Sequence, residues 1–295
     1  TSEAVTLAVD PSPVVVTQPG TGKLRRVLVG TSFTNTVKVA SCRDLTFEWR
    51  REGQVIVPGG RIEVVPVKNP TGDQTTCQLI VRGAQLSDSG NYDVVVRSPN
   101  GSVTSRSTAV QVMLPPPNDF FASRLTLTNA ASTLGGSNFF TSLALGSNYF
   151  GTAESGEPVH VGQNPLHSVW WTWQSPAPSQ VTVSLEGSDF DTLLSVFTGA
   201  ELGSLTLITN NDNAGGKITS RVSFLAARNR VFQFAVDGRR GDLEEGLIRM
   251  SVQAEEIVSP PIILYQPRHL AVRQGASATF AVGVWGSPRS EEHTS

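Results

Sequence analysis

The stretch Leu86-Ser87-Asp88-Ser89-Gly90-Asn91-Tyr92 decides the fold of the first third of the chain. The run from Asp93 to Val96 follows it and leads to Asn100-Gly101. Asn-Gly between two alternating runs is a strong hairpin signal, because both residues tolerate positive φ. Upstream, Phe47-Glu48-Trp49 alternates as a half-buried strand does. Such strand signals recur about every 8 to 12 residues, so residues 11–114 are predicted to form a two-sheet β-sandwich.

Trp49 combined with the D-x-G-x-Y pattern of Asp88, Gly90 and Tyr92 resembles the intermediate-set immunoglobulin domains. The resemblance implies that the tryptophan packs between the two sheets and that the tyrosine hydroxyl closes a corner onto nearby backbone. It also implies an ion pair between Arg61, at the start of the fourth strand, and Asp88. All of these residues are expected to be structural.

The cysteines depart from that family. Val39 and Val94 stand where the bridge between the two sheets is usually formed. In this topology Cys42 is expected at the end of the second strand and Cys77 at the start of the neighbouring fifth strand, which allows a non-standard disulfide between them. The alternative is two thiols that pack as small hydrophobic side chains.

Length and composition indicate a multidomain, all-β chain. The 295 residues suit two to three domains. The formal net charge is -2, and no dense Lys/Arg stripe is present to bind phosphates, so nucleic acid is not expected as a partner. No apolar run approaches the roughly 18 to 20 residues of a spanning helix, so no membrane span is expected in this fragment.

After a proline linker at 115–117, residues 118–254 are predicted to form a jelly-roll-like antiparallel β-sandwich, because strand-like segments alternate with Gly, Asn and Asp. The segments are Val181–Leu185, Thr192–Thr198, Leu205–Thr209, Val222–Leu225, Val231–Val236 and Leu247–Val252.

Several motifs are spread over this module: Asn118-Asp119-Phe120, Glu154 to His160, Ser168 to Trp173, Phe190-Asp191-Thr192, Phe197-Thr198-Gly199, Asn211-Asp212-Asn213 and Val236-Asp237-Gly238. Together they resemble bacterial pre-peptidase C-terminal domains and their relatives in large surface proteins of planctomycete- and verrucomicrobium-like bacteria. The resemblance implies an exported protein in which the module is a non-catalytic accessory.

Internal repetition suggests an array of modules. Pro13–Pro19 (PVVVTQP) matches Pro261–Pro267 (PIILYQP). We therefore expect residues 1–10 to be the last strand of a preceding immunoglobulin-like domain. Residues 255–261 are expected to be a linker, and 262–288 the start of a further, truncated immunoglobulin-like domain. The final RSEEHTS at 289–295 resembles a translated sequencing adapter and is left out of the fold prediction.

Three tryptophans within four residues invite a glycan-stacking interpretation. Alternation along a strand places Trp171 and Trp173 on one face and Trp170 on the other. Trp171 and Trp173 are the candidate glycan-binding pair, and structural packing is the alternative, since at least one face must be core.

A calcium site is the candidate cofactor site of the middle module. Asp191, Asp212 and Glu157 provide hard oxygen ligands in loop or strand-end positions, as calcium requires. They lack the spacing of a calcium-binding loop, and Asp also serves turns through its own local hydrogen bonds.

No catalytic motif is apparent. His160 and His167 fit neither a zinc motif nor a nucleophile–base pattern. The predicted function is that of a non-catalytic fragment of a secreted or cell-surface multidomain protein, which serves adhesion, carbohydrate or protein binding, or spacing. The alternative is a set of accessory domains from a larger secreted hydrolase or lyase. The expected location is extracellular or at the cell surface, with a glycan or protein there as partner.

Overall fold

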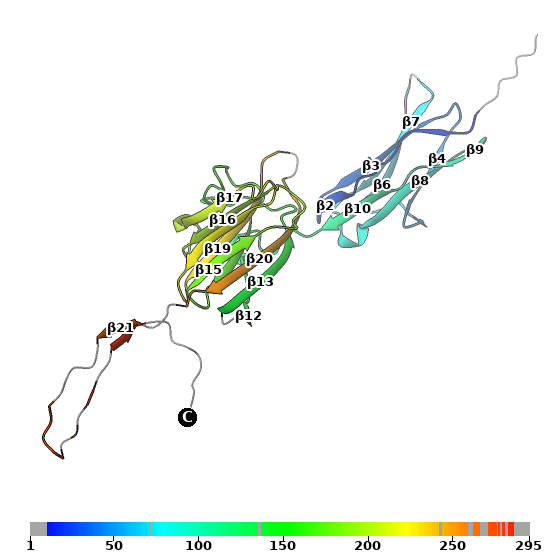
Figure 1. Ribbon diagram of the computed structural model, residues 1–295. Coiled ribbons are helices and arrows are strands. Elements are labelled where there is room, and N and C mark those ends of the chain that lie inside the picture. Colours follow the sequence, from blue (N-terminus) through cyan, green and yellow to red (C-terminus); the bar gives the residue numbers. More distant parts are fainter. Residues whose placement is uncertain are drawn as a thin grey trace, which may run out of the picture. The chain divides into compact units, whose positions relative to one another are not determined.

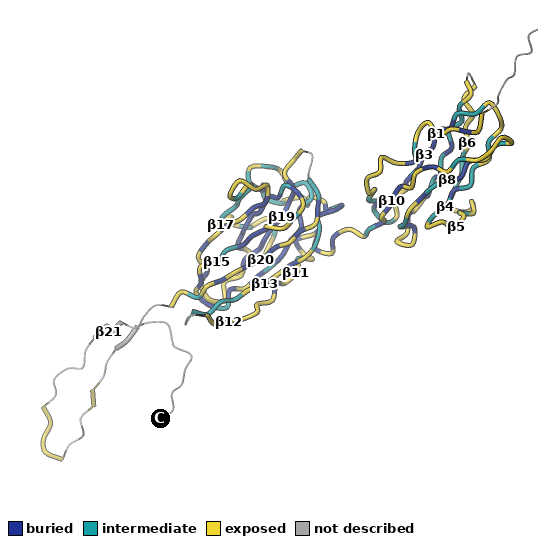
Figure 2. Tube along the Cα trace, turned by 45° about the vertical axis from the view of Figure 1, so that its right-hand side comes forward, coloured by how far each residue is buried: buried dark blue, intermediate teal, exposed yellow. Residues whose placement is uncertain are grey.

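The computed structural model describes residues 11–70, 72–134, 137–241, 244–258, 262–265, 271–275, 277, 279–280 and 283–285. The chain divides into two compact units, Thr1–Pro115 and Pro116–Ser295 (Figure 1). Each unit has its own hydrophobic core, visible as buried segments of the trace in Figure 2.

The first unit is a sandwich of two sheets. One sheet has the order β1-β3-β7-β6 and the other β2-β10-β8-β4-β5, with β9 also paired to β8. The strands are β1 (Val14–Thr17), β2 (Arg25–Leu28), β3 (Phe33–Ala40), β4 (Thr46–Arg51), β5 (Gln54–Val55), β6 (Ile62–Lys68), β7 (Gln74–Val81), β8 (Gly90–Ser98), β9 (Gly101–Thr104) and β10 (Thr108–Met113).

Strict alternation builds the core of this unit. Every second residue of β3 is buried, from Phe33 to Val39, and the intervening residues are half-buried. Val39 and Val94 are both fully buried in the same cluster as Trp49, so hydrophobic packing fills the positions of the usual bridge. The predicted immunoglobulin-like sandwich is the observed one, and its β8–β9 hairpin turns at Asn100 as expected.

The second unit is a sandwich of two five-stranded sheets, β11-β14-β19-β16-β17 and β12-β13-β20-β15-β18. The strands are β11 (Leu125–Thr126), β12 (Ala130–Leu134), β13 (Ser137–Ser147), β14 (Val169–Gln174), β15 (Ser179–Ser184), β16 (Thr192–Thr198), β17 (Thr206–Asn211), β18 (Arg221–Ala226), β19 (Val231–Gly238) and β20 (Leu247–Glu256).

Eight of these strands follow the order of a jelly roll, with β13-β20-β15-β18 opposite β14-β19-β16-β17. Side chains from both sheets meet in one large core, to which Trp171, Val183 and Met250 belong. A smaller cluster lies on the outer face of β14, β16 and β19 and contains Phe121 and Trp170.

The C-terminal segment is described in part. A two-stranded antiparallel ladder joins β21 (Ile262–Tyr265) and β22 (Gly283–Trp285). The interpretations of residues 1–10 and 289–295, and of part of 262–288, fall outside the described residues. Within the described ranges, no helix has the length and apolarity to cross a membrane.

Candidate functional site

The corner of the first unit is built as expected. Arg61 Nη1 and Nη2 donate to the two carboxylate oxygens of Asp88 at 2.5 and 2.7 Å, so the predicted ion pair is present. The Tyr92 hydroxyl donates to the Asp88 carbonyl at 2.5 Å. Burial alone would raise the pKa of Asp88, but the hydrogen bond from Arg61 outweighs it and the pKa lies below its usual value. These contacts fix the corner, in keeping with the structural role expected for its residues.

Cys42 and Cys77 are not joined in a disulfide. Cys77 lies opposite Val37 in the β3–β7 ladder, and its side chain points into the core. Cys42 is exposed and lies beyond the end of β3, whereas Val37, the ladder partner of Cys77, lies inside that strand. Of the two alternatives the disulfide is therefore wrong, and both cysteines are thiols. Cys77 packs in the core as a small hydrophobic side chain, whereas Cys42 is exposed and does not.

The tryptophans of β14 are all inside the protein. Trp171 and Trp173 are 2% and 0% exposed and lie between the two sheets. On the opposite face Trp170 is 0% exposed, because the ring of Phe121 covers it edge-on at 5.1 Å. The glycan-stacking prediction for Trp171 and Trp173 is therefore wrong, since neither ring reaches solvent, and structural packing explains both.

The three calcium candidates do not converge. Asp212 forms an ion pair with Arg239, whose backbone N–H donates to the Asp191 carbonyl at 2.9 Å. A positive side chain thus already lies beside these two carboxylates. Glu157 instead contacts His160 in a separate buried network. No group of three or more metal-binding side chains placed to hold an ion occurs in the described part of the chain.

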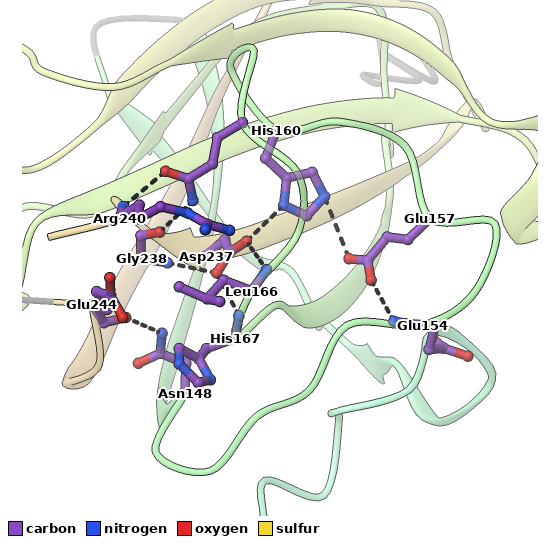
Figure 3. A network of polar contacts seen from close by, with 11 residues as sticks. Asn148, Glu154, Glu157, His160, Leu166, His167, Asp237, Gly238, Arg240 and Glu244 are labelled. Carbon is purple, nitrogen blue, oxygen red and sulfur yellow. Dashed lines mark hydrogen bonds and ion pairs between the residues drawn. The ribbon is translucent and has the colours of Figure 1, made fainter.

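That buried network fixes the long segment between β13 and β14 to the end of β19 (Figure 3). The Asp237 side chain is completely buried. Its carboxylate accepts hydrogen bonds from the backbone N–H groups of Leu166 at 2.9 Å, His167 at 2.8 Å and Gly238 at 2.7 Å. One side chain therefore satisfies three backbone donors, of which those of Leu166 and His167 lie in the irregular segment before β14.

His160 lies between two carboxylates. Its Nδ1 is 3.3 Å from Asp237 Oδ2, and its Nε2 is 3.5 Å from Glu157 Oε1. Burial raises the pKa of Glu157. Burial would also raise the pKa of Asp237, but the hydrogen bonds from His160 and the backbone lower it below its usual value. The three side chains are at most 1% exposed, so this group cannot touch a substrate and serves to hold the segment in place.

An accessible candidate site is a groove of about 700 Å³ on the outer face of the sheet β12-β13-β20-β15-β18. The ladder pairs place the side chains of this outer face in rows across four strands, and the groove lies over parts of two such rows. One row is Thr141, Gln253, Thr182 and Ser223, and the next is Leu143, Ser251, Ser184 and Arg221. The middle positions are Gln253 and Thr182 in the first row and Ser251 and Ser184 in the second, so polar and mostly small side chains line the hollow and make it rich in hydrogen-bonding groups.

Sequence reasoning missed this groove and the His160 network. The alternation of Arg249, Ser251 and Gln253 along β20 is a readable signal that these residues share one outward face. Which strands lie beside β20 is set by the topology, and no local pattern indicates the register between strands that are distant in the chain.

Residues 14–112 match the immunoglobulin I-set domain family, which confirms the resemblance for that segment. Among solved structures, the chain is similar to titin domain M7, with 24% identity over 36% of this chain and 98% of that chain and a TM-score of 0.31. It is also similar to the titin M10–obscurin-like 1 immunoglobulin complex, with 21% identity over 37% and 99% and a TM-score of 0.30. The BTLA ectodomain gives 16% identity over 34% and 99%, with a TM-score of 0.30. The search of curated proteins found no match. The pre-peptidase C-terminal resemblance of residues 118–254 stays a prediction.

Proposed function

We propose that this chain is a non-catalytic part of a secreted or cell-surface multidomain protein, and that its second unit binds an extracellular polysaccharide. The observation that carries the proposal is the groove on the sheet β12-β13-β20-β15-β18, whose floor consists of rows of Ser, Thr and Gln side chains. The immunoglobulin-like unit then serves as a spacer between modules.

The position of the groove favours a polysaccharide over an extended polypeptide. An extended peptide is usually bound by adding a strand to a sheet edge, where backbone groups are unpaired. The groove lies instead over β20 and β15, each of which pairs with a strand on both sides. A ligand in the groove can therefore contact only side chains, because the backbone groups of these strands are already paired. The hydroxyl and amide groups of those side chains can hydrogen-bond with the many hydroxyls of a sugar chain.

The dimensions of the face also suit a polymer. The four strands from β13 to β18 span about 14 Å across the sheet, and the segment from Arg249 to Gln253 spans about 14 Å along it. A single small metabolite would leave most of such an open surface in contact with water. A chain of sugar units can contact several rows of side chains at once.

Polysaccharide binding can be tested with the whole chain by affinity gel electrophoresis through gels that contain neutral or acidic polysaccharides. The variant Ser251→Trp places a large ring in the middle of the groove, and we expect it to abolish retardation. The control Thr206→Trp places the same ring at an exposed position of β17, in the other sheet, and should leave binding unchanged. Retardation by none of the polysaccharides, or equal retardation of Ser251→Trp and the unmodified chain, would refute the proposal.

The alternative, accessory domains of a larger secreted hydrolase or lyase, is compatible with the same groove. In that case the groove would hold the polymer substrate near a catalytic domain elsewhere in the protein. The complete gene decides between the two, because a catalytic domain in the same reading frame would favour the accessory role.

A further inference from the structure

One end of the groove is positively charged. Glu186 lies there and forms ion pairs with Lys217 and, at 3.0 Å, with Arg221. Both Glu186 and Arg221 line the groove, and both also line a smaller adjoining pocket of about 170 Å³ together with Lys217. Two cations therefore share one carboxylate, and a positive charge is left at this end.

Arg249 adds a second positive charge. Its side chain is exposed and lines the groove beside Glu186, and no ion pair to it occurs among the residues that the structure describes. Its stem packs on Gly187, where an added Cβ would lie 3.0 Å from Arg249 Cδ. Its backbone N–H donates to Ser188 Oγ at 3.0 Å. The loop after β15 thus leaves room for this side chain to lie along the groove with its guanidinium available.

The groove also lacks the feature by which proteins hold neutral sugars by stacking. The described tryptophans with assigned burial, at 49, 170, 171 and 173, are all buried, and the large apolar side chain in the groove is Leu143. Binding strength there must come from hydrogen bonds and charge. Because a guanidinium binds carboxylates and phosphate- or sulfate-like groups through two parallel hydrogen bonds, the preferred sugar carries such groups.

We infer that the polymer bound in this groove is an acidic polysaccharide, whose carboxylate or sulfate groups are held by Arg249 with support from Arg221 and Lys217. This inference rests on the proposed function and names the class of ligand. The hydroxyl rows contact the sugar units, and the cationic end selects charged sugars over neutral ones.

The test measures binding of the whole chain, at physiological and at high salt, to five polymers: polygalacturonate, dextran sulfate, neutral dextran, neutral galactan and polyglutamate. We expect the two acidic polysaccharides to bind at least tenfold more tightly than their neutral counterparts, about 1.4 kcal/mol, with a preference that shrinks as salt screens the charges. The ratio between polygalacturonate and dextran sulfate identifies which acidic group is preferred.

Arg249→Ala should weaken acidic polysaccharide binding about tenfold and leave neutral polysaccharide binding unchanged. The matched control is Arg230→Ala, which removes an exposed arginine just before β19, a strand of the other sheet, and should have no effect. Equal losses in the two arginine variants would overturn the inference, since they would indicate a diffuse charge effect.

Two further results separate the inference from the proposed function. If neutral polysaccharides bind as tightly as acidic ones, and Ser251→Trp abolishes that binding, the inference is overturned while the proposed function stands. The second result concerns polyglutamate. If it binds as tightly as polygalacturonate and Arg249→Ala weakens its binding by the same factor, the assignment to a sugar is overturned, because the groove would then recognise charge alone.

Discussion

Replacing Asp237 by asparagine should destabilise the second unit strongly, although the side chain keeps its shape. Asp237 Oδ1 accepts from the N–H groups of His167 and Gly238, and Oδ2 accepts from that of Leu166. An amide NH₂ group in place of either oxygen therefore faces at least one backbone donor. An unsatisfied buried donor costs about 1 to 3 kcal/mol, and the remaining bonds lose the reinforcement of a negative charge.

The expected loss is about 3 kcal/mol, which corresponds to a fall of about 10 °C in the melting temperature of a unit of this size. Scanning calorimetry of the whole chain measures it, and the transition of the immunoglobulin-like unit is an internal reference. The control is Asp191→Asn, because Asp191 Oδ1 has no hydrogen-bond partner in the described structure. The reasoning fails if both variants lower the melting temperature equally, or if the reference transition shifts as much as that of the second unit.

Three further predictions concern charge and burial. Arg61→Ala should destabilise the first unit by about 3 kcal/mol in urea unfolding, because the Asp88 side chain is 2% exposed and would keep only weaker partners. An effect below about 1 kcal/mol would contradict this. Burial raises the pKa of Cys77 to about 11, so a thiol reagent at neutral pH should modify Cys42 and reach Cys77 only after unfolding. Rapid modification of both in the folded chain would disprove it. Glu157 has a raised pKa in the folded state, so its contribution to stability is present below the unfolded pKa of about 4.3 and is lost as pH rises through the folded value. Glu157→Gln cannot ionise, so the difference in melting temperature between this variant and the unmodified chain should shift in favour of the variant from pH 4 to pH 7. An equal difference at both pH values would rule out this linkage.

The corner of the first unit could be predicted because its determinants are local. Asp88 and Tyr92 are four residues apart, and the hydroxyl of one meets the carbonyl of the other within a single turn. Arg61 is more distant, but the family resemblance supplied its strand position. Residues in a short, recognisable motif carry their own geometry, so the sequence was sufficient there.

The tryptophans of β14 show where local pattern fails. Alternation correctly separated Trp170 from Trp171 and Trp173, yet it cannot reveal that a distant segment covers the second face. Phe121 provides that cover from a short 3-10 helix about 50 residues earlier in the chain. A strand buried on both faces has no exposed side from which to bind a ligand.

The strand β13 has an inverted pattern and was not predicted. Its inward positions carry Ser142 and Ala144, both nearly buried, while Leu143 and Leu145 point outward and are 60% and 72% exposed. Hydrophobic alternation would assign the opposite faces. The small inward residues leave space for the large rings of the core. The sequence of the strand itself contains no signal for those rings, because they belong to other strands.

The His160 network and the groove both depend on contacts between distant parts of the chain. The pair His160 and Asp237 joins residues 77 apart, and the groove joins four strands whose order differs from their order in sequence. The individual polar residues were visible in the sequence, but the partner of each was not.

The position of β20 has a consequence for how the second unit is made. It is the last of the ten sandwich strands in the chain, yet it lies between β13 and β15, and Asn138 meets Glu256 118 residues away. Such long-range pairing is slow, because a large loop must close before any contact compensates for the lost entropy. In a chain that is synthesised from its N-terminus, β13 and β15 therefore lack the strand that joins them until β20 has emerged, and this sheet is the last part of the unit that can be completed.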